Sequence, residues 1–201
     1  MSKLIIVSAA CCAAISGCGG GAAASSPPDL GRLFLRAAQV GPGYHSGPQH
    51  LTLSGPASGG PCGAAARSES LRVARIYGVF TDHELPKAER VGVRNEVIAY
   101  ASGGAKQTMR ELQHLGSGCP PSYHVTPITD ANLLPGYIAR KTQVLADPNG
   151  EAHELTSIWI YQSRGDVVSE IFAAVPEGRE SSALVPVALH AAEESARNLA
   201  R

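Results

Sequence analysis

The sequence has little charge, and neither sign dominates. Of its 201 residues, 17 are lysine or arginine and 17 are aspartate or glutamate, and no run of one sign occurs. A protein that binds a phosphate backbone needs a basic patch or stripe on its surface. The sequence therefore predicts that nucleic acid is not a partner of this protein.

Recognisable catalytic and metal-binding motifs are also missing. The chain contains no G-x-S-x-G elbow, no H-E-x-x-H helix and no phosphate-binding glycine loop. Glu111 and His114 lie three residues apart, but carboxylate-bridged metal sites need such a pair twice, so a solvated polar face is favoured. His45 and His50 flank a Gly-Pro loop with no regular element to hold them. We expect no enzyme, no metal and no cofactor.

A long apolar run of the kind that crosses a membrane does not occur at the N-terminus. After Lys3, the apolar run from Leu4 to Ile15 has about 12 residues, whereas a membrane-spanning helix needs about 20. A short basic start followed by such a run is typical of a secretory signal peptide. We expect this segment to direct secretion and then to be removed.

The end of this run indicates where the peptide is cut. Ile15-Ser16-Gly17-Cys18 resembles the lipobox of bacterial lipoproteins, in which an aliphatic residue and two small residues precede a cysteine. The resemblance implies a signal peptide of residues 1–17 and a diacylglyceryl group on Cys18, and acyl chains such as palmitate anchor a protein stably when two or more are present. The alternative is an ordinary secretory peptide cut elsewhere. The cell membrane, on its extracytoplasmic face, is thus the expected location and first partner.

Large apolar side chains are absent from residues 18–29, which consist mainly of glycine, alanine, serine and proline. Such a segment cannot offset the entropy cost of ordering, so we expect a flexible tether. Residues 30–201 have the usual length of a single domain with one hydrophobic core.

Cysteine is scarce once the five cysteines are sorted. Cys11 and Cys12 leave with the signal peptide and Cys18 carries the lipid, so Cys62 and Cys119 remain. Two thiols in an oxidising compartment suggest a disulfide, which in the chain-entropy model contributes roughly 4 kcal/mol for a loop of this length. Two separate free thiols are the alternative.

The rest of the chain alternates between helix and strand patterns. Asp29 is expected to cap a short helix with apolar residues at 30, 33, 34 and 37. The segment from Ser46 to Gly63 is rich in glycine, serine and proline and reads as a surface loop. The remaining patterns predict strands at 71–81, 90–100, 123–126, 138–145, 153–162 and 167–174, and helices at 102–115 and 185–199.

Two turn sequences decide how the later strands are arranged. Asp147-Pro148-Asn149-Gly150 and Arg164-Gly165-Asp166 each supply the residues of a tight turn, so the strands that they join should be antiparallel. Amphipathic helices need the apolar face of such a sheet. The sequence therefore predicts an α+β domain, with a twisted antiparallel sheet and helices packed on one face.

The faces of two strands bear on function. Val93 and Val97 alternate with Arg94 and Glu96, which predicts one buried face and one mostly wet face.

Trp159 and Tyr161 likewise alternate with Ile158 and Ile160. If the aliphatic pair faces the helices, the two rings line the open face and are placed to hold a ligand, whereas the opposite assignment puts Trp159 in the core. Arg140 and Thr142, in the neighbouring strand, are undecided in the same way. The candidate ligand-binding residues are Trp159, Tyr161 and Arg140.

Several short segments form a pattern that extends over most of residues 30–200. They are Leu33-Phe34-Leu35, Gly43-Tyr44, Gly103-Gly104-Ala105 with Met109 and Leu112, Cys119-Pro120, Leu134-Pro135-Gly136 and Arg164-Gly165-Asp166-Val167-Val168. Together they resemble the PknH-type extracellular sensor domain, a family that occurs at the outer end of actinobacterial serine/threonine kinases and in free-standing lipoproteins. The resemblance implies an antiparallel sheet with helices against one face, a ligand cleft on the other, and a Cys62–Cys119 bond. Members typically carry a second disulfide, for which this chain has no cysteines left.

These observations favour a non-catalytic, membrane-anchored lipoprotein that binds an unknown small molecule or envelope ligand, as a sensor does. No kinase domain follows, so signalling would need a protein partner. A carrier of envelope lipid is the first alternative, and it requires an apolar cavity large enough for acyl chains. An extracytoplasmic hydrolase is the second, and it requires a catalytic set of serine, histidine and carboxylate that the sequence does not show.

Overall fold

The computed structural model describes residues 28–53, 66–86, 90–115, 119–146, 149–150, 152–175 and 182–201. The signal peptide, Cys18, most of the tether and Cys62 lie outside the described residues. The lipidation of Cys18, the flexibility of the tether and the Cys62–Cys119 bond therefore stay predictions.

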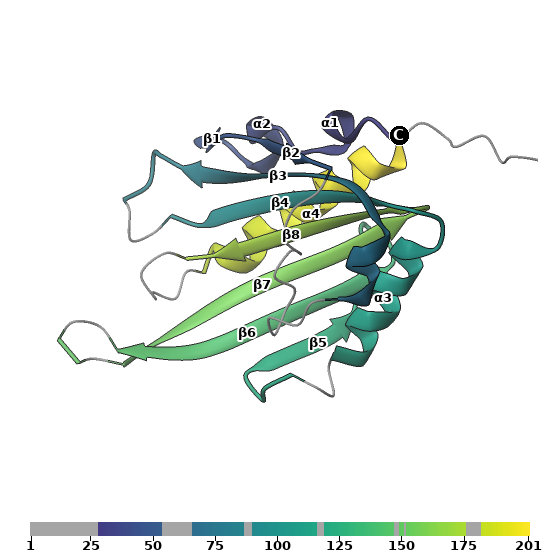
Figure 1. The fold of residues 1–201 in the computed structure, drawn as a ribbon. Coiled ribbons are helices and arrows are strands. Elements are labelled where there is room, and N and C mark those ends of the chain that lie inside the picture. The colour runs from purple at the N-terminus through teal and green to yellow at the C-terminus, as the bar shows by residue number, and fades with distance from the viewer. Residues whose placement is uncertain are drawn as a thin grey trace, which may run out of the picture.

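The centre of the fold is an eight-stranded antiparallel sheet (Figure 1). Its strand order is β1-β3-β4-β8-β7-β6-β5, and β2 pairs with β3 beside β1. The predicted α+β class and the antiparallel sheet are confirmed. The strands are β1 (Tyr44–Ser46), β2 (His50–Thr52), β3 (Arg72–Asp82), β4 (Gly92–Tyr100), β5 (Tyr123–Pro127), β6 (Gly136–Ala146), β7 (Ala152–Arg164) and β8 (Val167–Ala174).

Local turn chemistry explains the hairpins of β6, β7 and β8. Arg164 pairs with Val167 across a two-residue turn in which Gly165 has φ of +59°, a conformation that favours glycine. The β6–β7 hairpin pairs strands of 11 and 13 residues in antiparallel register, and Gly150 at its tip has φ of +85°. The turn at Gly165, the positive φ of Gly150 and the antiparallel return of β7 agree with the prediction from sequence, whereas Asp147 and Pro148 lie outside the described residues.

Register divides the sheet into two faces. On β7, Ile158 and Ile160 point to one side and Trp159 and Tyr161 to the other, because successive strand residues alternate. The two isoleucines are buried in the core that contains Leu184, Ala188 and Ala191 of helix α4 (Leu184–Ala200). We call their side the α4 face. The question that the sequence left open is thus answered, since Trp159 and Tyr161 lie on the opposite face.

The α4 face is also covered by two short helices, α1 (Leu30–Leu33) and α2 (Ala37–Val40). Asp29 caps α1 as predicted, since its side chain accepts a hydrogen bond from the Gly31 N–H at 3.1 Å. The sequence suggested one continuous helix. The helix breaks because the backbone N–H of Leu35 donates instead to Asn95 Oδ1 on β4, at 3.0 Å in a buried position.

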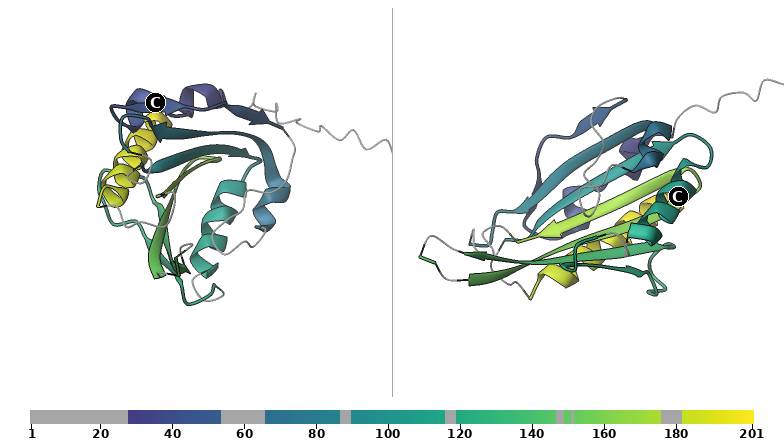
Figure 2. Two further views of the ribbon diagram at one scale, coloured as in Figure 1. Left: turned by 90° about the vertical axis from the view of Figure 1, so that its left-hand side faces the viewer. Right: turned by 60° about the horizontal axis from the view of Figure 1, so that its bottom comes forward.

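One helix packs on the opposite face, which refines the expectation that helices occupy a single face. Ala105 and Leu112 of α3 (Gly104–Leu115) join Ile98 and Val168 in a second apolar cluster. Figure 2 shows the sheet bending around α3, with α4 on the other side. The helical turn η2 (Arg67–Leu71) lies beside α3. Only part of this face is covered by described helices.

The segment from Ser46 to Gly63, expected to be a loop, contains β2 and begins at the last residue of β1, so that expectation is wrong for part of its described residues. Both strands extend along the outer edge of β3 and have only three residues each. Pairing with β3 satisfies backbone groups that a free loop would leave to water.

Within the described residues, the helices are all too short or too polar to cross a bilayer.

Candidate ligand-binding face

The sheet side opposite α4 carries aromatic and charged side chains from six strands. We call it the aromatic face. It is built by the register of the strands, which places Glu96 opposite Glu170, Glu170 opposite Tyr161, and Arg94 opposite Phe172. Its members are Arg75 and Tyr77 on β3, Arg94 and Glu96 on β4, Phe172 and Glu170 on β8, Trp159 and Tyr161 on β7, Lys141 on β6, and Tyr123 on β5.

Three half-buried rings form a continuous row across this face. The centroids of Trp159 and Phe172 are 4.8 Å apart with their planes at 49°, and those of Tyr123 and Trp159 are 6.1 Å apart at 37°. These are ordinary geometries for attracting aromatic pairs. The row runs across the strands rather than along them.

A cation lies over each end of the row. The guanidinium carbon of Arg94 is 5.2 Å from the centre of the Phe172 ring, and Nζ of Lys141 is 5.5 Å from the centre of the Tyr123 ring. Both distances allow cation–π attraction. In strand order the groups across the sheet are therefore Arg94, Phe172, Trp159, Lys141 and Tyr123, so the two cations lie on either side of Phe172 and Trp159.

Beside the row lies a set of buried ion pairs. Arg75 Nη1 is 3.2 Å from Glu96 Oε1, and Arg94 Nη2 contacts Glu170 Oε1. The two carboxylates are 3% and 1% exposed, so each has been taken out of water and depends on its arginine.

Burial and mutual repulsion change the titration of these carboxylates. Burial, followed by the negative charge of Glu170, raises the pKa of Glu96 from 4.5 to about 7, against the opposing effect of Arg75 and Arg94. Burial also raises the pKa of Glu170, although Arg94 opposes the rise. Two carboxylates held side by side in a dry environment resist simultaneous ionisation.

Tyr161 completes this set. Its side chain is 4% exposed, and burial followed by the charge of Glu170 raises the pKa of its hydroxyl well above 10. A hydrogen bond with the Glu170 carboxylate contributes to the rise, so the Tyr161 hydroxyl belongs to the same buried polar set, although the two groups are not well aligned.

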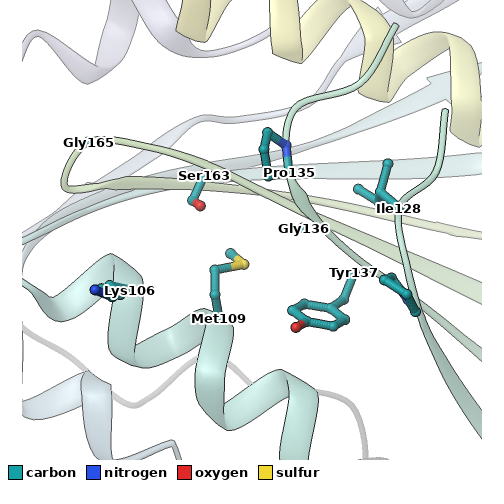
Figure 3. Close-up of a pocket in the computed structure, with 9 residues that line it drawn as sticks. Lys106, Met109, Ile128, Pro135, Gly136, Tyr137, Ser163 and Gly165 are labelled. Carbon is teal, nitrogen blue, oxygen red and sulfur yellow. The ribbon is translucent and has the colours of Figure 1, made fainter. Parts of the chain in front are cut away.

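A hollow lies on the same face, between α3 and the ends of β5, β6 and β7 (Figure 3). Its volume is about 400 Å³. Met109 projects into it from α3, and Tyr137 and Ser163 line it from the strands, with Lys106 near its rim. The lining is mostly apolar, so this hollow suits an apolar group better than a charged one.

The structure separates the three residues proposed from sequence. Trp159 and Tyr161 lie together on the aromatic face, but Arg140 does not join them. It pairs with Ile158 in register, which places it on the α4 side of β6, where it is exposed. Thr142 lies on the same side as Arg140. The charged residue of β6 on the aromatic face is Lys141, which pairs with Ser157.

Sequence reasoning missed Arg94, Glu96 and Glu170 as site residues. It assigned Arg94 and Glu96 to a mostly wet face, whereas Glu96 and its neighbour Ile98 are buried. The available signal was a charged residue in the middle of each of two apolar strands, which the alternation rule alone reads as solvent exposure. The pairing of Glu96 with Glu170 joins positions 74 residues apart and has no sequence signature.

The weak metal candidates have other partners. Glu111 accepts hydrogen bonds from the backbone N–H and hydroxyl of Ser68, and so holds η2 against α3. His50 stacks on Tyr77 with centroids 4.9 Å apart, and His45 meets His83 edge to face. Over the described ranges, no three histidine, cysteine or acidic residues gather in a way that could hold a metal ion.

No protein-family model matches this chain, and no curated protein sequence matches it. Among solved structures, the chain is similar to the crystal structure of the extracellular domain of PknH from Mycobacterium tuberculosis, with 11% sequence identity and a TM-score of 0.46. The similarity covers 86% of this chain and 98% of that domain. A similarity at this level shows neither a common ligand nor a common activity, so membership of the sensor family stays a prediction.

Proposed function

We propose that this protein is a lipid-anchored extracytoplasmic lipoprotein that binds a ligand on its aromatic face without transforming it, as a sensor domain does. The row of Phe172, Trp159 and Tyr123, with a cation over each of its two end rings, carries this proposal. Half-buried rings among charged groups are typical of binding surfaces.

The buried charges support binding over catalysis. A general acid or base must come within hydrogen-bond distance of the reacting atoms. Glu96 and Glu170 are almost inaccessible, and each is engaged by an arginine. These two ion pairs lie beneath the site and support it as a rigid layer. Perturbed carboxylates are also common at functional sites, which is consistent with a site on this face.

The anchoring part of the proposal rests on sequence. The Ile15-Ser16-Gly17-Cys18 lipobox supplies the lipidated thiol, and residues 18–29 supply the tether. The first described residue of the chain is Pro28, directly before α1, on the α4 side of the sheet. A tether that joins the domain on this side leaves the aromatic face free to meet a ligand.

A carrier of envelope lipid is the second candidate, and the hollow beside Met109 favours it. Its mostly apolar lining would receive an acyl tail. A carrier would copurify with extractable lipid, whereas a sensor of polar ligands would not.

The test is intact mass spectrometry of the protein from its own membrane fraction, with Cys18→Ser as the matched variant. We expect a chain that starts at Cys18 and carries diacylglyceryl mass, and a Cys18→Ser chain that lacks this mass and leaves the membrane fraction. Alkylation before and after reduction is expected to label Cys62 and Cys119 only after reduction. A full-length, unlipidated wild-type chain with free thiols would refute the proposed location.

A further inference from the structure

We infer that the aromatic face recognises an acidic oligosaccharide: sugar rings lie against Phe172, Trp159 and Tyr123, and carboxylates of the sugar meet Arg94 and Lys141. The inference rests on the proposed function and names the chemical class of its ligand.

The sign of the ligand's charge follows from the groups around the rings. Each end of the row already has its own cation, Arg94 over Phe172 and Lys141 over Tyr123. A cationic ligand would be repelled by both. The negative groups of the face, Glu96 and Glu170, are buried and paired with arginines, so the accessible charge is positive. The face therefore favours an anion.

Lys141 and Arg94 both have capacity left for such an anion. Within the described part of the chain, no carboxylate pairs with Lys141, whose ammonium group lies over the Tyr123 ring. Arg94 uses one terminal nitrogen on Glu170, and its side chain is 30% exposed, so part of the guanidinium group stays accessible. A carboxylate at either end would form a charge-assisted hydrogen bond.

The rings determine the rest of the ligand. Their centroids are spaced at 4.8 and 6.1 Å, and the planes tilt by 49° and 37° from one ring to the next. A large flat ring system cannot lie against three surfaces that tilt in this way. A chain of separate small rings can, because each sugar ring presents a face of C–H groups that packs on one aromatic ring.

The span of the site agrees with a short chain. Arg94 on β4 and Lys141 on β6 are separated by three strand spacings, which is about 14 Å along the sheet and about the length of two to three sugar rings. A ligand of this length would cross the strands from Arg94 to Lys141. An acyl chain is a poor alternative here because two cations lie among the rings.

The sole tryptophan of the chain makes the inference directly measurable. Trp159 is the middle ring of the row, so its fluorescence reports on this surface alone. Full-length mature protein in detergent is titrated with uronic-acid trimers of the galacto, manno and gluco series, and with the methyl esters of the same trimers. We expect a saturable change in emission with at least one acid, and binding of its ester about tenfold weaker. Raising the salt concentration should weaken the binding of the acid and leave the binding of the ester unchanged.

A matched pair of variants localises the binding. Lys141 and Arg140 are neighbours in β6 on opposite faces of the sheet. Lys141→Met is expected to weaken binding of the acid about five- to tenfold and to abolish its affinity advantage over the ester. Arg140→Met is expected to leave the affinities of acid and ester unchanged. Circular dichroism of both variants checks that the fold is retained.

Three outcomes would overturn the inference. No response of Trp159 to any acid trimer, equal binding of acid and ester, or equal loss in Arg140→Met would each exclude recognition of acidic groups on this face. A thymidine trinucleotide that binds more tightly than every uronate would instead assign the site to phosphates. In that last case ligand binding and the proposed function would stand while the saccharide class failed. Absence of the lipid on Cys18 would instead refute the proposed membrane location and leave the saccharide inference standing.

Discussion

The two faces of one sheet bury polar groups in different ways, and adjacent residues of β4 show the contrast. Asn95 on the α4 face is fully buried, accepts a hydrogen bond from Leu35 and donates to Ser169 and to the Glu170 carbonyl. Glu96 on the aromatic face is almost equally buried, but it is charged, and burial beside Glu170 raises its pKa to about 7. On the α4 face, neutral polar groups are satisfied by well-placed hydrogen bonds. On the aromatic face, burial and mutual repulsion disfavour the ionised forms of the two carboxyl groups.

The α4 face continues this neutral pattern across the sheet. Ser169 and Ser195 lie 2.6 Å apart between β8 and α4, and the Gln162 side chain donates to the Ala192 carbonyl while accepting from the Leu134 N–H. These contacts fix the position of α4 without any buried charge. The comparison indicates that the α4 face serves the fold and that the aromatic face retains costly groups for another purpose.

The largest expected difference between the faces is in packing, and two phenylalanines test it. Phe80 is 0% exposed and stacks on Phe34 on the α4 face, whereas Phe172 is half-buried on the aromatic face. Phe80→Ala should lower the free energy of unfolding by about 3–5 kcal/mol, because it leaves a cavity in the core. Phe172→Ala should lower it by about 1–2 kcal/mol, because less area is lost from contact. Urea unfolding followed by circular dichroism measures both, and equal losses would remove the distinction.

The next effect concerns pH. A carboxyl group whose pKa is raised in the folded state binds its proton more tightly there than in the unfolded chain. Its contribution to stability is fully present below pH 4.5 and is lost as the pH rises through about 7. We expect the wild type to be more stable at pH 5 than at pH 8, by up to about 3 kcal/mol from Glu96.

Glu96→Gln should flatten this dependence, because the amide does not titrate. Glu194→Gln is the matched control: hydrogen bonds from Gln39 and Arg197 outweigh its slight burial and lower the pKa of Glu194, so this residue has no titration near neutrality to lose. Unfolding curves at a series of pH values give the measurement. An unchanged slope in Glu96→Gln would show that the charge on the aromatic face is better satisfied than its burial implies.

The smallest expected effect is at the neutral contact between Ser169 on β8 and Ser195 on α4. Ser195→Ala removes one partner of the Ser169 hydroxyl and should lower the free energy of unfolding by about 1–2 kcal/mol. Adding Ser169→Ala should cost less than the sum of the two single changes, because the contact is already gone. Both variants should leave the pH dependence untouched. Additive losses would mean that the two hydroxyls act independently.

Much of the local structure could be predicted from residues close in sequence. The strands of the meander, helices α3 and α4, the Asp29 cap and the turn at Gly165 appear near their predicted places, because each depends on a periodic pattern or on a residue with a special backbone preference. Predictions failed where a contact with a residue far away in the sequence decides the local structure. The chain leaves its helix at Phe34 because Asn95, 60 residues away from Leu35, offers a better hydrogen bond.

The candidate site divides in the same way. Alternation in β7 predicts that Trp159 and Tyr161 share a side, but it cannot tell which side meets α4. The same rule could not decide between Arg140 and Lys141, and the choice of Arg140 was wrong for this face. Arg94, Glu96 and Glu170 come together only through pairing of β4 with β8.

The sequence by itself determined the elements, the antiparallel hairpins and the predicted lipid attachment at Cys18, since these follow from composition, short-range periodicity and turn chemistry. Only the tertiary structure decided which face α4 covers and which rings and charges gather on the other. The physical reason is that strand alternation sorts side chains into two faces but does not say which face is buried. That choice is made when the apolar surface of a helix far along the chain is buried against one face.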